Sequence, residues 1–173
     1  MHTHRHRPRL IAIAAPRPSF TAPGHALILA ALVALALLLF SALPRAHAGL
    51  FGGPIQVKAQ AGLIKIPVAE VSDGKAHFYS YNAGAKEVRF FALKSKDGVI
   101  RTALDACDVC YREKKGYKQD GDVMICNNCG MKFHSTKVME VKGGCNPSPL
   151  ARSVEGSTVV IREADLKAGV GYF

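Results

Sequence analysis

Five cysteines carry the chemistry that this sequence could perform. Four of them form two Cys-x-x-Cys pairs with fifteen residues between the pairs, in the stretch "DACDVCYREKKGYKQDGDVMICNNCG". Two residues between cysteines allow a tight turn to point both sulfurs at one cation, and two such turns complete a tetrahedron. The spacing therefore predicts a site for iron or zinc at Cys107, Cys110, Cys126 and Cys129.

Three other residues near the pairs are candidates for supporting roles. Cys145, in "KGGCNPSPL", lies between two glycines and two prolines, in a loop suited to placing a side chain. It is a candidate ligand or a thiol beside the metal, and the alternative is a buried, inert cysteine. His134 follows Cys129 by five residues and is more simply a surface histidine. Asp105 is expected to cap the turn before Cys107 or to accept a backbone hydrogen bond there.

Two other uses of the cysteines remain open. Disulfides suit an oxidising compartment, although an odd number of cysteines leaves one unpaired. A redox-active dithiol is the second alternative, because a Cys-x-x-Cys turn lowers the thiol pKa. Such a pair usually begins a helix within a βαβ pattern, which the sequence lacks. Signatures of nucleophilic hydrolases, phosphate loops, dinucleotide-binding turns and His-Glu-x-x-His zinc enzymes are also missing from the sequence.

The N-terminus predicts export. A basic start, "MHTHRHRPRL", precedes the apolar run "ALILAALVALALLLF" and then the small-residue site "AHA". This order is typical of a secretory signal peptide, here residues 1–48, and the alternative is an anchor that stays in the inner membrane. Pro8 separates Arg7 from Arg9, so the twin-arginine signal for prefolded proteins is absent. We therefore expect a periplasmic or otherwise exported protein that acquires its metal after export.

Charge excludes one class of partner. Residues 1–48 hold five of the 23 Lys and Arg and no acidic residue, which leaves 18 basic against 13 acidic residues and a net charge of +5. The basic residues are spread along the chain and form no block of the kind that binds nucleic acid. Removing 48 of 173 residues leaves 125, enough for one domain.

Short β-prone runs separated by turn residues fill the part of the chain before the cysteines. Residues 49–54 are a Gly-rich lead-in, and residues 55–173 are expected to form the domain. The runs "GLIKIPVAEV", "AHFYSYN", "EVRFFALK" and "VIRTALD" predict three or four antiparallel strands, and "READLKAG" predicts a short helix. The fold class is therefore mostly β (α+β). The charged segment between the cysteine pairs buries little, so a metal is expected to organise this half as in a zinc ribbon or rubredoxin.

The cysteine-rich stretch resembles the FtrD-like family of membrane iron–sulfur-containing proteins. The resemblance runs from about Ile55 to the terminal "GYF" and rests on "DACDVC", "ICNNCG" and "GGCNP". It implies that all five cysteines occupy recurrent cysteine positions of the family. It also implies a place in bacterial ferrous-iron uptake, beside an iron permease and periplasmic iron-handling proteins. Relatives often carry several transmembrane helices before this domain, whereas this chain has one apolar segment.

These observations together predict an exported accessory protein of an iron-uptake system. It would hold one Cys-bound metal, either iron (single or iron–sulfur) or zinc, and pass electrons or metal to an iron-uptake permease or a periplasmic iron-handling protein. Membrane contact would occur through the N-terminal segment. One alternative is a thiol–disulfide oxidoreductase that uses Cys107 and Cys110, with Cys145 as the resolving thiol. The others are a zinc-organised docking module and, least supported, a copper(I) carrier.

Overall fold

The computed structural model describes residue 28 and residues 53–173. The expected signal peptide (residues 1–48) and the lead-in (residues 49–54) lie outside the described residues, apart from Ile28, Gly53 and Pro54. Contacts divide the chain into residues 1–46 and 47–173, and the description below concerns the second unit. Within the described residues, no helix has the length and apolar character needed to cross a membrane.

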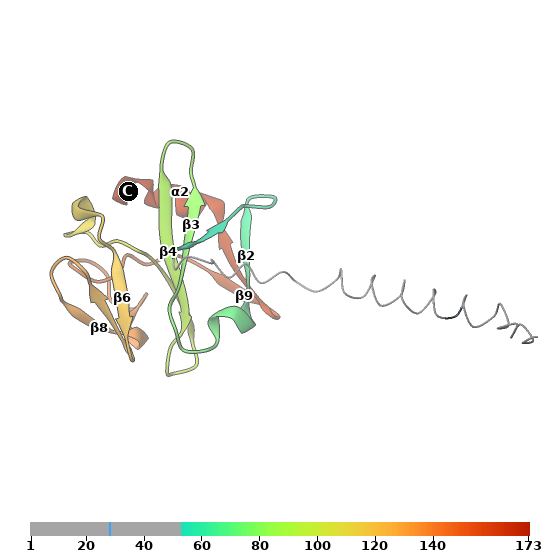
Figure 1. Cartoon of the computed structure of the whole chain (residues 1–173), viewed down its shortest axis with the longest axis horizontal. Helices are drawn as coiled ribbons and strands as arrows, with labels where there is room; N and C mark the ends of the chain where they lie inside the picture. Colours follow the sequence, from blue (N-terminus) through green and yellow to red (C-terminus); the bar gives the residue numbers. More distant parts are fainter. Residues whose placement is uncertain (1–27, 29–52) are drawn as a thin grey trace, which may run out of the picture. The chain divides into compact units, whose positions relative to one another are not determined.

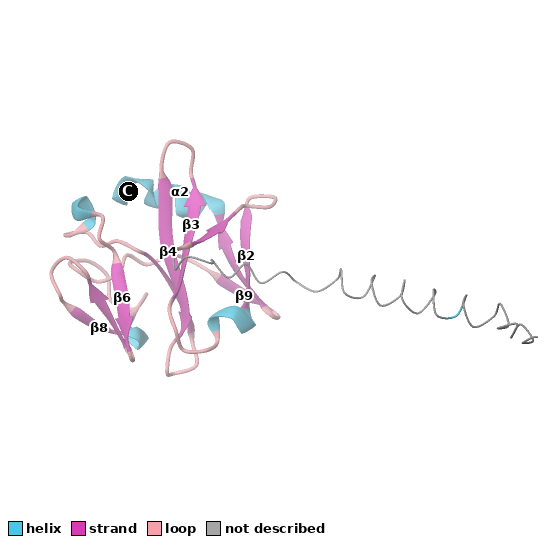
Figure 2. Ribbon diagram, viewed as in Figure 1, coloured by secondary structure: helices cyan, strands magenta, loops and turns pink. Residues whose placement is uncertain are grey.

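Strands are the main regular secondary structure of this unit, as Figure 2 shows. They form three sheets, which we call central, outer and cysteine sheets. The central sheet has the order β1 (Ile55–Val57), β3 (His77–Asn82), β4 (Glu87–Lys94), β5 (Ile100–Leu104). The outer sheet has the order β2 (Leu63–Pro67), β10 (Thr158–Arg162), β9 (Ser153–Glu155). The cysteine sheet has the order β6 (Tyr117–Asp120), β7 (Val123–Cys126), β8 (Lys132–His134).

Helical elements are short. The α-helix α2 (Glu163–Ala168) follows β10 directly, and four 3-10 turns complete the structure: η1 (Val68–Val71), η2 (Tyr111–Glu113), η3 (Ser135–Lys137) and η4 (Gly169–Tyr172). In α2, Glu163 and Asp165 lie in the first turn and Lys167 in the last, which is the arrangement that the helix dipole favours. The predicted helix at "READLKAG" is therefore confirmed.

Strand β4 is buried on both faces and separates two apolar cores. Successive side chains of a strand point to opposite faces. Val88, Phe90 and Ala92 belong to a first core cluster, and Phe91 and Leu93 belong to a second. Figure 1 shows the central sheet between the outer sheet on one side and the cysteine sheet on the other.

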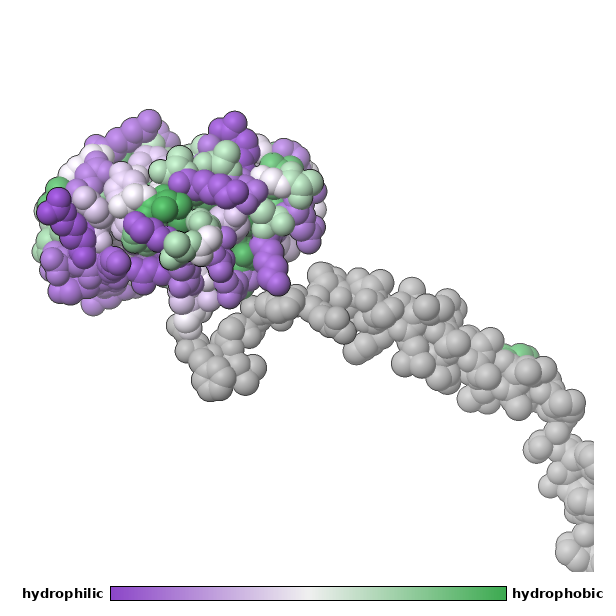
Figure 3. All heavy atoms as spheres, turned by 90° about the horizontal axis from the view of Figure 1, so that it is seen from above, coloured by the Kyte–Doolittle hydropathy of each residue, from purple (hydrophilic) through white to green (hydrophobic). Residues whose placement is uncertain are grey.

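The first core lies between the central and outer sheets and contains no cysteine. Its other members include Ile64, Ile66, Val159, Ile161 and Leu166, all at most 2% exposed. The surface is different: the face drawn in Figure 3 is largely hydrophilic, with hydrophobic residues confined to small areas. This half thus has the ordinary structure of two β-layers closed over an apolar interior.

The mostly β, antiparallel fold is confirmed, with two differences in strand pairing. β1 pairs with β3 in parallel, with Ile55 opposite Tyr79. β2 does not pair with β1 or β3, which are next to it in sequence, but pairs antiparallel with β10, with Ile66 opposite Val159. Alternation of apolar residues indicates which face of a strand is buried, but it does not identify the partner strand. The cysteine sheet is small and antiparallel, while a zinc-ribbon fold for this half stays a prediction.

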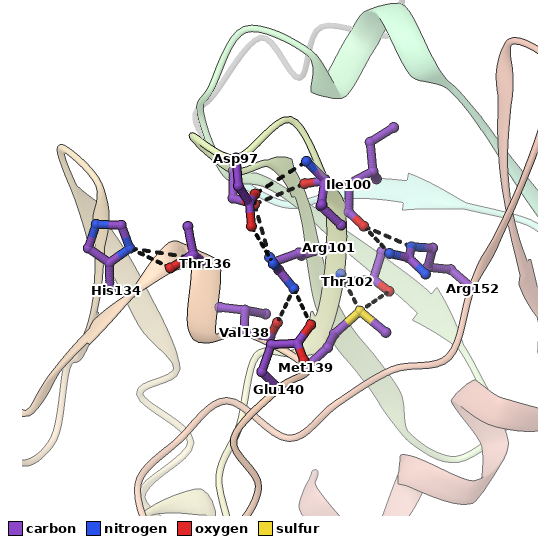
Figure 4. Close-up of polar contacts among 12 residues, drawn as sticks. Asp97, Ile100, Arg101, Thr102, His134, Thr136, Val138, Met139, Glu140 and Arg152 are labelled. Carbon is purple, nitrogen blue, oxygen red and sulfur yellow. Dashed lines mark hydrogen bonds and ion pairs between the residues drawn. The ribbon is translucent and has the colours of Figure 1, made fainter.

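A buried arginine connects the central sheet to the cysteine-rich half (Figure 4). Arg101 on β5 is 5% exposed and donates from Nη2 to Asp97 Oδ2 (2.6 Å) and from Nη1 to Glu140 Oε1 (2.7 Å). It also donates to the carbonyl oxygen of Val138 (3.1 Å) and from Nε to Ser95 Oγ (2.9 Å). These bonds attach the β4–β5 turn to the segment that leads to Cys145.

Candidate metal centre

The structure brings the five cysteines together from three segments of the chain. Cys107 and Cys110 lie in the turn after β5, Cys126 ends β7, Cys129 lies in the β7–β8 turn, and Cys145 lies in the loop after η3. Their sulfurs form two groups, Cys107 with Cys110 and Cys145, and Cys110 with Cys126 and Cys129. Within each group all sulfurs lie within 4.8 Å of one another. Cys110 belongs to both groups.

The donor set and its dimensions fit a thiolate-bound ion. The Sγ atoms of Cys110 and Cys145 are 3.7 Å apart. Two thiolates on one tetrahedral ion, each at ~2.3 Å from it, lie about 3.8 Å from each other. Soft sulfur ligands suit iron and zinc better than hard cations such as calcium or magnesium. The cysteines are therefore able to hold the kind of metal that their spacing predicts.

The second Cys-x-x-Cys turn has the backbone that its glycine suggests. Gly130 has a positive φ of 72° and donates its N–H to the carbonyl oxygen of Cys126 (2.9 Å). The backbone N–H groups of Cys129 and Asn128 act to lower the pKa of the Cys126 thiol, and that of Met131 lowers the pKa of the Cys129 thiol. Hydrogen bonds from the backbone to sulfur favour the thiolate, the form that binds metal.

The first Cys-x-x-Cys turn also directs a backbone N–H group at a sulfur, although no glycine follows its second cysteine. The N–H of Cys110 donates to Cys107 Sγ (3.2 Å), and the N–H of Tyr111 donates to the Cys107 carbonyl oxygen (3.2 Å). Tyr111 then begins the 3-10 turn η2, and the left-handed residue is Lys114, with φ 52°. The chain therefore changes direction four residues after Cys110 rather than immediately after it.

The thiols differ in exposure and in acidity. Cys129 is exposed, and the Met131 N–H lowers the pKa of its thiol to about 7. Burial raises the pKa of the Cys126 thiol to about 11. The neighbouring Cys129 side chain, followed by burial, raises the pKa of the Cys145 thiol. In the absence of metal, Cys129 is thus the thiol among these three that ionises most readily.

Asp105 connects the first cysteine pair to β6 through a buried hydrogen bond. Its Oδ1 atom accepts the N–H of Tyr117 (2.7 Å), and it is 7% exposed. Burial raises its pKa to about 6, which the Tyr117 hydrogen bond and the charge of Arg89 oppose. A Cβ atom at Gly116, where φ is 63°, would overlap the Asp105 carboxylate. Asp105 thus accepts a backbone hydrogen bond, but from the start of β6 and not from the turn of the first cysteine pair, where it was expected.

Tyr117 holds the fifth cysteine in place. Its hydroxyl donates to the carbonyl oxygen of Cys145 (2.7 Å), and its ring packs edge-on against Phe91, with centroids 6.3 Å apart. Burial raises its pKa far above the usual value, so the hydroxyl stays protonated and remains a donor. The spacing of the cysteines gave no sign of this contact, because residues 117 and 145 meet only in the folded chain.

His134 lies apart from both cysteine groups. Its Nδ1 atom accepts the N–H of Thr136 (3.3 Å) and lies 2.9 Å from Thr136 Oγ1 (Figure 4). The side chain is exposed and caps the 3-10 turn η3. It therefore has a local structural role of the kind expected for a surface histidine.

Comparison with known proteins supports the resemblance found in the cysteine motifs. No curated protein matches this sequence. A family model described as "Membrane iron-sulfur containing protein FtrD-like" matches residues 71–173, a span that includes all five cysteines and most of the described domain. The chain belongs to this FtrD-like family.

Proposed function

We propose that this protein is an exported accessory protein of a bacterial iron-uptake system, in which its cysteines hold iron or zinc and pass electrons or metal to a partner. The five-sulfur cluster is the observation that carries this proposal. Family membership adds the connection with iron–sulfur chemistry. The protein would act in the periplasm, either free or held at the inner membrane by its N-terminal segment.

The exposed edge of the cluster is suited to transfer. Cys129 is exposed, and Met131, two residues later, is 53% exposed. Val109, between Cys107 and Cys110, is 63% exposed. Lys115 donates to Asn128, the residue before Cys129 (3.0 Å), and Lys132 follows Cys129 by three residues. Both lysines are exposed. Exposed basic residues beside the cysteine turn complement a partner surface that carries acidic residues. The expected partner is an iron-uptake permease or a periplasmic iron-handling protein.

Elemental analysis with a visible absorption spectrum tests the proposal. The protein is produced from the full-length sequence and purified without added metal. Stoichiometric iron with thiolate-to-iron absorption bands that bleach on reduction supports electron transfer. Stoichiometric zinc in a colourless protein makes the cysteines structural and leaves a docking role. A protein without stoichiometric metal, whose thiols react only after treatment with a reductant, contradicts the metal-binding proposal.

Thiol–disulfide exchange is the second candidate function, because one thiol has suitable properties. Cys129 is exposed and has a pKa of about 7, close to the value at which an attacking thiol works best near neutral pH. Cys107 is 1% exposed and Cys110 is 9% exposed, so the first pair is poorly placed to attack another protein. Exchange would therefore begin at Cys129, with Cys126 or Cys145 as the resolving thiol.

Trapping experiments separate the two candidates. If the protein exchanges disulfides, Cys126→Ser and Cys145→Ser variants accumulate mixed disulfides with a model disulfide substrate. If it holds metal, these variants lose metal and the unmodified protein reacts slowly with thiol reagents until a chelator is added.

A further inference from the structure

The grouping of the sulfurs differs from that of a single four-cysteine site. In a tetrahedral site the four ligand sulfurs all lie about 3.8 Å from one another, and they would form one group of four. Among residues 53–173 the sulfurs instead form two groups of three that share Cys110. The two cysteines of the first Cys-x-x-Cys pair differ in this respect. Cys107 belongs only to the group with Cys145, whereas Cys110 belongs to both groups.

We propose that the five cysteines form a two-ion centre in which the Cys110 thiolate bridges both ions. Cys107, Cys110 and Cys145 would bind the first ion, and Cys110, Cys126 and Cys129 would bind the second. This inference rests on the proposed function and adds to it the number of ions and the role of each cysteine. A thiolate sulfur has enough lone pairs to bind two ions at once, and Cys110 is the cysteine that both groups contain.

Charge balance supports two ions over one. One divalent ion bound by four thiolates carries a net charge of −2 and leaves the fifth cysteine as a neutral thiol, whereas two divalent ions bound by five thiolates carry a net charge of −1. Cys107 and Cys126 are 1% and 2% exposed, and uncompensated charge at buried positions is costly. The Sγ atoms of Cys110 and Cys145 are 3.7 Å apart, so the shared cysteine lies at ligand distance from a member of the first group.

The two positions differ in their access to solvent. The first group contains the buried Cys107, and Tyr117 holds Cys145 in place through its carbonyl oxygen (2.7 Å). Each group has three protein sulfurs, which leaves a fourth coordination position open at both ions, but the exposed Cys129 belongs to the second group. We therefore propose that the ion at the first position stays bound, whereas the ion at the second position exchanges with a partner.

Cadmium-113 NMR with native mass spectrometry tests the bridge. The protein from the full-length sequence is stripped of metal and loaded with ¹¹³Cd²⁺, a spin-1/2 substitute for zinc in sulfur sites. We expect two ions per chain and two cadmium signals that split each other through the shared sulfur. One ion and one signal would overturn the bridge and leave the proposed function standing. No bound ion would overturn both.

Single substitutions assign the two positions. Cys129→Ser is expected to reduce the content to one tightly held ion and to remove the splitting, while the signal of the first position survives. Asn128→Ala, in the same exposed turn, is the matched control and should keep two coupled ions, because its side chain bonds only Lys115. Loss of both ions from Cys129→Ser, or retention of two coupled ions in it, would contradict the assignment.

Analysis for acid-labile sulfide distinguishes the proposed centre from an iron–sulfur cluster. In the protein as isolated, two metal ions without inorganic sulfide support a thiolate bridge. Two irons with an equal amount of acid-labile sulfide would show that sulfide, rather than Cys110, joins the ions, and would overturn the proposal.

Discussion

The two sides of the central sheet are stabilised in different ways. Toward the outer sheet, the first core consists of aliphatic and aromatic residues, most of them from five strands and helix α2. Toward the cysteine sheet, residues 106–148, all of them described, add six buried members to the second core, and three of these are cysteines. The other three are Tyr117, Met124 and Val138. The first half is held by apolar burial, and we expect the second to depend on a metal bound by its cysteines.

Polar contacts between the two halves compensate in part for this small core. Asp105 attaches β6 to the first cysteine pair, and Arg101 attaches the β4–β5 turn to residues 138–140. Such contacts fix positions but add less stability than apolar burial does, because each replaces hydrogen bonds to water. The comparison therefore predicts that metal removal, mutation and pH act unequally on the two halves.

Metal removal should have the largest effect. Structural zinc sites contribute apparent free energies on the order of 10 kcal/mol, and this contribution is lost with the ion. After chelation, we expect amides of β6 and β7 to exchange with solvent much faster, while amides of β3 and β10 remain protected. Hydrogen exchange measured by mass spectrometry checks this, with zinc added back as the control. Equal loss of protection in both halves would show that they do not differ as proposed.

Phe90 and Phe91 are adjacent on β4 but belong to different cores, so substitutions at these two positions compare the cores. Both are fully buried, but Phe90 stacks on Tyr79 in the first core (5.2 Å between centroids) and Phe91 packs on Tyr117 in the second. Phe90→Ala and Phe91→Ala should each lower the free energy of unfolding by about 3–5 kcal/mol. Only Phe91→Ala should also weaken metal binding, by about tenfold, because Tyr117 positions Cys145.

Urea unfolding of the metal-saturated protein measures the first effect of these two variants. Competition with a coloured chelator measures the second. If Phe90→Ala weakens metal binding as much as Phe91→Ala does, metal affinity depends on the overall stability of the protein rather than on the Phe91–Tyr117 contact.

The sequence predicted the local features of the cysteine-rich half well, because they depend on neighbours along the chain. The proximity within each Cys-x-x-Cys pair and the left-handed turn at Gly130 follow from short-range geometry. The helix at Glu163–Ala168 follows from local charge and helix-forming residues. Each of these features involves residues at most seven positions apart.

The remaining features depend on contacts between distant residues, and the sequence alone did not predict them. The pairing of β2 with β10 joins Ile66 to Val159, almost a hundred residues later. The division of the sulfurs into two groups depends on how Asp105 and Tyr117 place the loops that carry Cys107 and Cys145. Buried Arg101 breaks the apolar pattern of β5, and only its distant partners explain this.

A smaller effect is expected from filling the space beside Asp105. Gly116→Ala introduces a Cβ atom that overlaps the buried carboxylate, in a backbone with φ 63°. Left-handed strain and overpacking together should lower the free energy of unfolding by about 3 kcal/mol. Gly121→Ala is the matched control, since Gly121 has φ 55° and open space around its Cβ position. Its expected cost is about 1 kcal/mol, from strain alone.

Thermal unfolding of the two glycine variants isolates the contribution of the Asp105 contact. The difference between them should be clear in the melting temperature and should be accompanied by weaker metal binding in Gly116→Ala. Equal melting temperatures would mean that Asp105 moves away without cost and does not fix the start of β6.

The smallest effect concerns the acid sensitivity of the Arg101 connection. Hydrogen bonds from Ser95 and Arg101 lower the pKa of Asp97 to about 2, from 3.8. Because this pKa is lower in the folded protein, the contribution of Asp97 to stability is complete above pH 4 and disappears as the pH falls toward 2. Asp97→Asn removes this pH-dependent contribution, so its melting temperature should fall less steeply than that of the unmodified protein over the same interval.

The difference between the two melting profiles is the quantity to measure, because protonation of the thiols and loss of metal affect both proteins alike. Ser95→Ala should lie between the two profiles, since the Ser95 hydroxyl is the first cause of the lowered pKa and Arg101 remains. Parallel profiles for Asp97→Asn and the unmodified protein between pH 4 and pH 2 would show that Asp97 is already free of Arg101 in solution. In that case Glu140 and Val138 alone would keep Arg101 joined to the cysteine-rich half.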